Sequence, residues 1–237
     1  MLLFRILLTG HVIAGLVALV SFWAPVVLRK GSAQHRRWGR VFANALIVAG
    51  SLAIGMSLCT LADPVGTHPT ATSSAADLAL YRGLFGWMML FLGILTIAMA
   101  RHGLLSVRNA RAHDRHRSVG SIALQVAVLV SAAQCGWTGY RIGQPLMIGV
   151  AVVGSITALI YLRFMLQRSP PRGAYLQQHL RAFIGAGISA YTAFLAVGLL
   201  RLMPAHVFNP LLWTVPSIVG VGLIVYHQFR APRPVQS

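Results

Sequence analysis

Seven long apolar runs, separated by short polar connections, fill almost the whole chain. They cover about residues 3–28, 38–62, 78–100, 119–140, 146–166, 183–203 and 211–229. Each run has roughly the 20 residues that a helix needs to cross the hydrocarbon core of a membrane. None alternates apolar and polar residues as a barrel strand does, and a spanning segment has to satisfy its own backbone hydrogen bonds. The pattern predicts an all-α integral membrane bundle of seven transmembrane helices, which forms one domain over residues 1–237.

The composition agrees with lipid as the solvent. Of the 237 residues, 57% are hydrophobic and only 10% are charged, which is too few polar residues to cover the surface of a water-soluble domain. The formal net charge is +17, and the basic residues lie in the short connections between the apolar runs. Anionic lipid headgroups are therefore the expected partners, and nucleic acid is not.

The acidic and cysteine residues exclude several classes of chemistry. The chain has three carboxylates, Asp63, Asp77 and Asp114, no glutamate, and no acid inside an apolar run. Paired-carboxylate hydrolysis, carboxylate-bound Mg²⁺ or Ca²⁺, and proton or sodium coupling through an intramembrane acid all lack the groups they need. Cys59 and Cys135 have no metal-ligand spacing and are interpreted as small buried hydrophobes. The sequence leaves open whether they form a disulfide.

Basic residues are concentrated in alternate connections. They are Arg29, Lys30, Arg36, Arg37 and Arg40 in the first, Arg101, Arg108, Arg111, Arg115 and Arg117 in the third, Arg168, Arg172 and Arg181 in the fifth, and Arg230 and Arg233 in the tail. The opposite loops, at 63–77, 141–145 and 204–210, are nearly free of Lys and Arg. The positive-inside rule then predicts an N-terminus outside and a cytoplasmic C-terminus.

A short internal repeat gives the candidate functional residues. A histidine followed closely by arginine opens the second, fourth and sixth predicted helices, all on the predicted cytoplasmic side. The candidates are His35, Arg36, Arg37, His116, Arg117, His179 and Arg181. Helix N-termini, histidine and arginine at one depth favour an anion, so we expect a non-enzymatic membrane protein that binds an anionic lipid headgroup or a small anion there. The competing interpretation is the ordinary topology signal of basic residues at cytoplasmic helix ends.

The same histidines allow a b-type haem. Its iron takes two histidines from facing helices and its propionates lie against arginine, which makes His35, His116 and His179 the candidate iron ligands; no other metal site is predicted. The protein would then be an electron-transfer protein or a haem-dependent membrane oxidoreductase. A small transporter is a second alternative, based on the glycine-rich helices and the parallel repeat, with Pro216 as the candidate kink.

Three polar residues fall inside the apolar runs. His11 lies about eight residues, or on the order of 12 Å, from the outer end of the first run. Gln134 lies at a comparable depth, and Tyr191 lies near the middle of the sixth run. An interhelical hydrogen bond that fixes packing is the favoured interpretation, and a ligand or proton-transfer role is the alternative.

Several stretches resemble a bacterial family of multi-pass membrane proteins of unknown function. They are residues 30–40 (KGSAQHRRWGR), 114–117 (DRHR), 179–187 (HLRAFIGAG), 190–194 (AYTAF) and 213–216 (WTVP). The resemblance implies a bacterial inner-membrane location and no activity. A fainter resemblance, to cytochrome b561-type haem proteins, rests only on the histidine-x-x-x-glycine openings of the helices. Membrane lipids are the expected partners, and a homo-oligomer or a partner subunit is left open.

Reporter fusions test the predicted orientation. Alkaline phosphatase, which is active only after export, should be inactive when it is fused within residues 101–117 and active when it is fused within residues 63–77. Basic connections that stay in the cytoplasm are the physical reason. An active fusion at 101–117 would reverse the assignment of sides.

Overall fold

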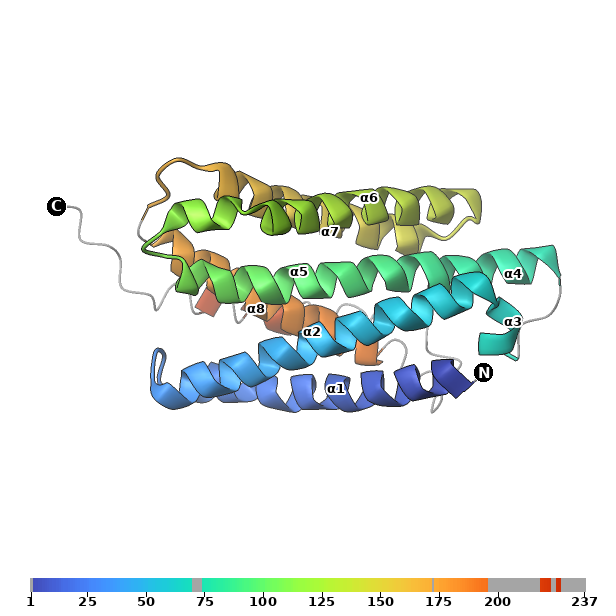
Figure 1. Ribbon diagram of the computed structural model, residues 1–237, viewed down its shortest axis with the longest axis horizontal. Helices are drawn as coiled ribbons and strands as arrows, with labels where there is room; N and C mark the ends of the chain where they lie inside the picture. Colours follow the sequence, from blue (N-terminus) through green and yellow to red (C-terminus); the bar gives the residue numbers. More distant parts are fainter. Residues whose placement is uncertain (1, 70–73, 172, 196–217, 223–224, 227–237) are drawn as a thin grey trace. The chain divides into compact units, whose positions relative to one another are not determined.

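The computed structural model describes residues 2–69, 74–171, 173–195, 218–222 and 225–226. The regular structure of these described residues is helical, with no strand among them (Figure 1). Five helical segments are long and apolar enough to cross a membrane: 2–27, 33–62, 75–108, 119–141 and 145–166. The all-α prediction is thus confirmed for the described residues. The five segments are compatible with a multi-pass membrane protein.

The elements follow one another with short connections. They are α1 (Leu2–Val27), α2 (Ala33–Ala62), α3 (Pro64–Thr67), α4 (Ala75–Tyr81), the π-helical segment η1 (Arg82–Met88), α5 (Met89–Arg108), the 3-10 turn η2 (His113–Arg117), α6 (Val119–Arg141), α7 (Pro145–Leu166) and α8 (Ala174–Ala193). Segments α4, η1 and α5 form one continuous helical stretch of 34 residues.

Several predicted helix ends were wrong. The second helix begins at Ala33 instead of residue 38, and the third continues to Arg108 instead of ending at residue 100. The sixth, α8, begins at Ala174 and not at residue 183, whereas its predicted end and most of the seventh run lie outside the described residues. The reason is that hydropathy marks where the apolar surface stops, whereas a helix continues through polar residues until its backbone hydrogen bonds stop.

The chain divides into two compact units. Unit 1 comprises Met1–Leu16, Ala45–Ala98 and Ala112–Arg168, and unit 2 comprises Val17–Asn44, Met99–Arg111 and Ser169–Ser237. The boundaries fall inside α1 and α2 and within the stretch from α4 to α5, so single long helices contribute to both units. Each unit has its own packing.

Close contact between helix backbones organises unit 1. A Cβ atom added to Gly50 of α2 would lie 2.9 Å from the carbonyl oxygen of Gly93 in α5, and one added to Gly93 would lie 2.9 Å from the carbonyl oxygen of Gly50. The two helices therefore cross at a pair of glycines, as small residues allow in membrane helix packing. The hairpin of α6 and α7 turns at Gly143, whose φ of 66° is in the left-handed region that favours glycine.

Aromatic side chains pack the interior of unit 2. The Phe22 ring of α1 lies 5.4 Å from the Phe42 ring of α2, which in turn lies 5.7 Å from the Phe183 ring of α8. The Phe22 ring also covers Gly187 of α8, where a Cβ atom would collide with it. This stack joins three helices next to the ends that carry the histidines.

Alanine at Gly50 tests the crossing in unit 1. Gly50→Ala should lower the free energy of unfolding by about 1–3 kcal/mol, because the new methyl group meets a backbone oxygen and the Ile97 side chain. Gly149→Ala in α7 is the matched control, since nothing lies within 4 Å of its added Cβ. Thermal unfolding of the detergent-solubilised variants measures both. Equal effects would mean that the two helices do not approach as described.

Candidate functional site

Four helix ends meet on one side of unit 2: the C-terminal ends of α1 and α5 and the N-terminal ends of α2 and α8 (Figure 1). The His35 ring of α2 and the His179 ring of α8 have their centroids 6.5 Å apart across this side. Two of the three repeated histidines are thereby brought together.

Unit 2 carries basic residues without any acidic residue. Asp63, Asp77 and Asp114 all belong to unit 1. Nine of the described residues of unit 2 are basic, namely Arg29, Lys30, Arg36, Arg37, Arg40, Arg101, Arg108, Arg111 and Arg181. No carboxylate within the unit can therefore balance this charge.

Side chains around the first connection use local backbone partners. Lys30 Nζ donates hydrogen bonds to the carbonyl oxygens of Pro25 and Val26, at 2.8 and 2.6 Å, and so caps the end of α1. Arg36 donates to the Gly31 carbonyl oxygen. The Ser32 hydroxyl accepts from the His35 backbone N–H at 3.1 Å, which caps α2. The free N–H groups of this helix end are thus partly satisfied already.

Several exposed arginines on the helices of unit 2 are available to a partner. Arg37, Arg40, Arg101 and Arg181 are exposed and make no hydrogen bond or ion pair with the described residues. We call these four residues the arginine set. They come from three helices of unit 2, namely α2, α5 and α8.

Backbone carbonyls fix both histidine rings of unit 2. His179 Nδ1 lies 2.8 Å from the carbonyl oxygen of Gly103 in α5, and His35 Nδ1 lies 3.1 Å from that of Pro25 in α1. A carbonyl oxygen only accepts, so each Nδ1 carries the hydrogen. In the neutral ring the lone pair is then on Nε2.

A buried pair of polar side chains lies next to these histidines. His102 Nε2 of α5 lies 3.1 Å from Gln178 Oε1 of α8, and both residues are buried. Because the amide oxygen accepts, His102 Nε2 donates. Gln178 was not among the predicted site residues, although its place beside His179 in the chain was an available signal.

His116 and Arg117 belong to unit 1 and hold η2 against the end of α7. Arg117 donates from Nη2 to the Gln167 carbonyl oxygen at 2.9 Å and from Nε to that of Met165 at 3.3 Å. His116 is fully buried, and its ring lies 5.4 Å from the Phe164 ring. Burial, with the neighbouring His113, lowers the pKa of the His116 imidazole to about 4. This arrangement gives both residues a structural task.

The three polar residues inside the apolar runs do not contact one another, and each has a different partner. His11 Nδ1 lies 2.9 Å from the Ala49 carbonyl oxygen, and Gln134 Nε2 donates to Thr138 Oγ1 at 3.3 Å. Tyr191 donates to the Leu19 carbonyl oxygen at 2.9 Å and accepts from Trp23 Nε1 at 2.6 Å. The His11 and Tyr191 contacts are interhelical and connect α1 to α2 and to α8. Cys59 and Cys135, both in unit 1, are free thiols.

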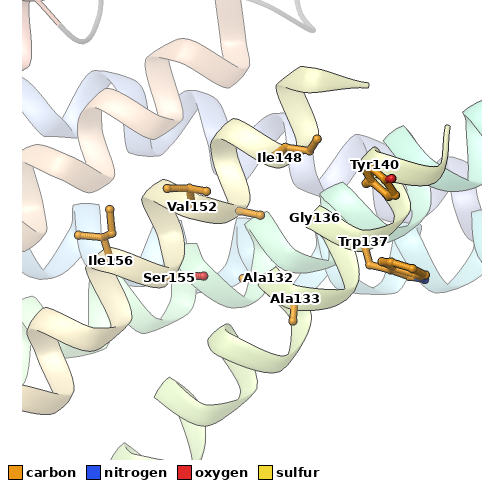
Figure 2. Close-up of a pocket in the computed structure, with 10 residues that line it drawn as sticks. Ala132, Ala133, Gly136, Trp137, Tyr140, Ile148, Val152, Ser155 and Ile156 are labelled. Atoms are coloured by element: carbon orange, nitrogen blue, oxygen red, sulfur yellow. The ribbon is translucent and has the colours of Figure 1, made fainter. Parts of the chain in front are cut away.

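An apolar groove of about 590 Å³ lies between α6 and α7 in unit 1 (Figure 2). Its lining consists of Ala132, Ala133, Gly136, Trp137, Tyr140, Ile148, Ala151, Val152, Ser155 and Ile156. Figure 2 shows Trp137 and Tyr140 together at one end and Ile156 at the other. The lining offers apolar contact and two hydroxyl groups, which suits a hydrocarbon chain and no acid–base chemistry.

The described part of the chain contains no group of three or more His, Cys, Asp or Glu side chains placed to hold a metal ion. Comparison with family models, with curated proteins and with solved structures finds no match.

The buried His116 predicts a pH-dependent stability. Its pKa in the folded protein is about 4 and its ordinary value is 6.5, so the unfolded chain binds more protons between these two pH values. The contribution of His116 is complete above pH 6.5 and is lost as the pH falls toward 4. When the pH is lowered from 6.5 to 4 in detergent, the melting temperature of His116→Met should therefore fall less than that of the parent protein. Parallel curves would refute the buried, neutral imidazole.

Proposed function

We propose that the chain is a multi-pass protein of the bacterial inner membrane, with its N-terminus outside, that binds an anionic lipid headgroup at the arginine set of unit 2. One observation carries the proposal: among the described residues, a single compact unit has nine basic side chains and no carboxylate. Exposed guanidinium groups without a counter-charge attract the nearest anions. At a membrane surface these are lipid phosphates.

Guanidinium chemistry favours phosphate among the available anions. Arginine presents a planar fork of N–H donors that matches two phosphate oxygens, and each basic residue near the surface adds about 1 kcal/mol of attraction to an anionic membrane. The arginine set lies near helix ends, which is the depth of lipid headgroups in the proposed topology. A phosphodiester headgroup would connect α2, α5 and α8.

The sequence predicted that the histidines and the arginines bind the anion together, whereas in this proposal only the arginines bind it. The Nδ1 hydrogens of His35 and His179 are already donated to backbone carbonyl oxygens. When the rings are neutral, Nε2 only accepts, and a lone pair repels a phosphate oxygen. Arginines therefore bind the anion, and His35 and His179 are available for another partner.

Lipid binding with matched double variants tests the proposal. The protein is placed in phosphatidylcholine nanodiscs with a small fraction of phosphatidylglycerol, and the lipid retained is measured by native mass spectrometry. Arg37→Ala with Arg181→Ala should weaken phosphatidylglycerol binding by about 2 kcal/mol, or roughly 30-fold, and added salt should reduce the difference.

The control removes the same charge elsewhere. Arg5 and Arg141 are exposed residues of unit 1, and their double alanine variant should bind phosphatidylglycerol nearly as the parent does. Equal losses in the two double variants would show a general charge effect. No retained phosphatidylglycerol in the parent protein would refute the proposed function.

A further inference from the structure

Two nitrogen lone pairs are left over at the histidine pair of unit 2. Each Nδ1 is tied to a carbonyl oxygen, and no described residue donates a hydrogen bond to Nε2 of His35 or His179. Metal-binding histidines show this arrangement, in which a carbonyl fixes the tautomer and the ring orientation and leaves the other nitrogen for the metal. Both histidines of the pair thus have the carbonyl hydrogen bond that commonly orients a metal-binding imidazole.

The spacing of the two rings fits one shared metal atom. A metal binds an imidazole nitrogen at about 2.0–2.1 Å, and two rings on opposite sides of it then have centroids about 6 Å apart. The observed centroid separation of His35 and His179 is 6.5 Å, with an angle of 57° between the ring planes. The rings come from different helices, as opposed axial ligands require.

The number of ligands distinguishes between kinds of metal centre. A bare zinc ion in a protein normally takes three or four protein ligands, and the described residues form no group of three. An iron porphyrin brings four ligands of its own and needs only two from the protein, which are commonly histidines. Two histidines alone therefore suit the porphyrin.

The charge of unit 2 also favours a porphyrin over a bare metal ion. A divalent ion would add positive charge beside Lys30 and Arg36 in a unit without carboxylates. Haem brings two propionates, which supply the anionic groups that the unit lacks. Phe183, whose ring meets the His179 ring edge-on at 4.8 Å, offers an apolar contact to a porphyrin face.

We propose that His35 and His179 are the two axial ligands of a haem iron in unit 2. The carbonyl oxygens of Pro25 and Gly103 position the two rings, and basic side chains of unit 2 bind the propionates. This inference goes beyond the proposed function and does not depend on lipid binding.

Asparagine variants remove the proposed ligands with little other change. In His35→Asn and His179→Asn, the amide N–H₂ can still donate to the carbonyl oxygen that Nδ1 reaches, whereas the Nε2 lone pair is gone. His68→Asn, in the loop after α3 of unit 1, is the matched control. Size-exclusion profiles check that all variants remain folded.

The full chain is expressed with haem supplied, purified in detergent, and examined by reduced-minus-oxidised absorption and by elemental analysis. We expect about one haem per chain with the sharp α band of a low-spin, two-histidine centre. Either asparagine variant should lose that band, and His68→Asn should keep it.

Three results would overturn the inference. The first is a parent protein without a Soret or α band. The second is a low-spin band that survives in both asparagine variants, which would assign the iron to other ligands. The third is stoichiometric copper or zinc without porphyrin that is lost in the same variants, which would make the pair a bare-ion site.

Discussion

Backbone carbonyl oxygens act in this chain as the main acceptors for its many polar and cationic side chains. With three carboxylates against 20 basic residues, side-chain donors have few acidic partners. His11, His35, His179, Tyr191 and Lys30 all reach carbonyl oxygens instead. A helical carbonyl has a second lone pair, so it accepts such a bond while it keeps its place in the helix. The contacts between polar groups within each unit depend on this arrangement.

The histidines and the arginines of the repeat therefore have two different roles. A carbonyl partner fixes the direction in which a histidine ring points, whereas an exposed arginine without a partner stays a mobile positive charge. In unit 2 the two kinds of group lie next to each other, at His179 and Arg181 for example. A ligand that carries an anionic group and an electron-pair acceptor would bind the arginines and the histidines. A simple anion would bind only the arginines.

The apolar runs were enough to predict helices, because long stretches of apolar residues have few other ways to satisfy their backbones. They could not predict where the helices begin, as the nine extra residues at the start of α8 show. The meeting of His35 with His179 followed from their shared place near helix starts. Their partners did not, because the carbonyl oxygens of Pro25 and Gly103 belong to the backbone, which every residue has. Likewise, nothing in the repeat distinguished His116, a buried residue of unit 1, from the other two.

The π-helical segment η1 has a geometric effect on unit 1. Gly83 and Gly86 lie three residues apart, and in an α-helix they would point within about 60° of each other. The wider π turn roughly doubles that angle. Accordingly, Gly83 meets Ile142 after α6, whereas Gly86 meets Leu61 of α2. One widened turn thus allows a single helix to pack against two neighbouring segments, with a glycine at each contact. The side chains before Arg82 and those after Met88 are therefore offset from each other around the helix axis.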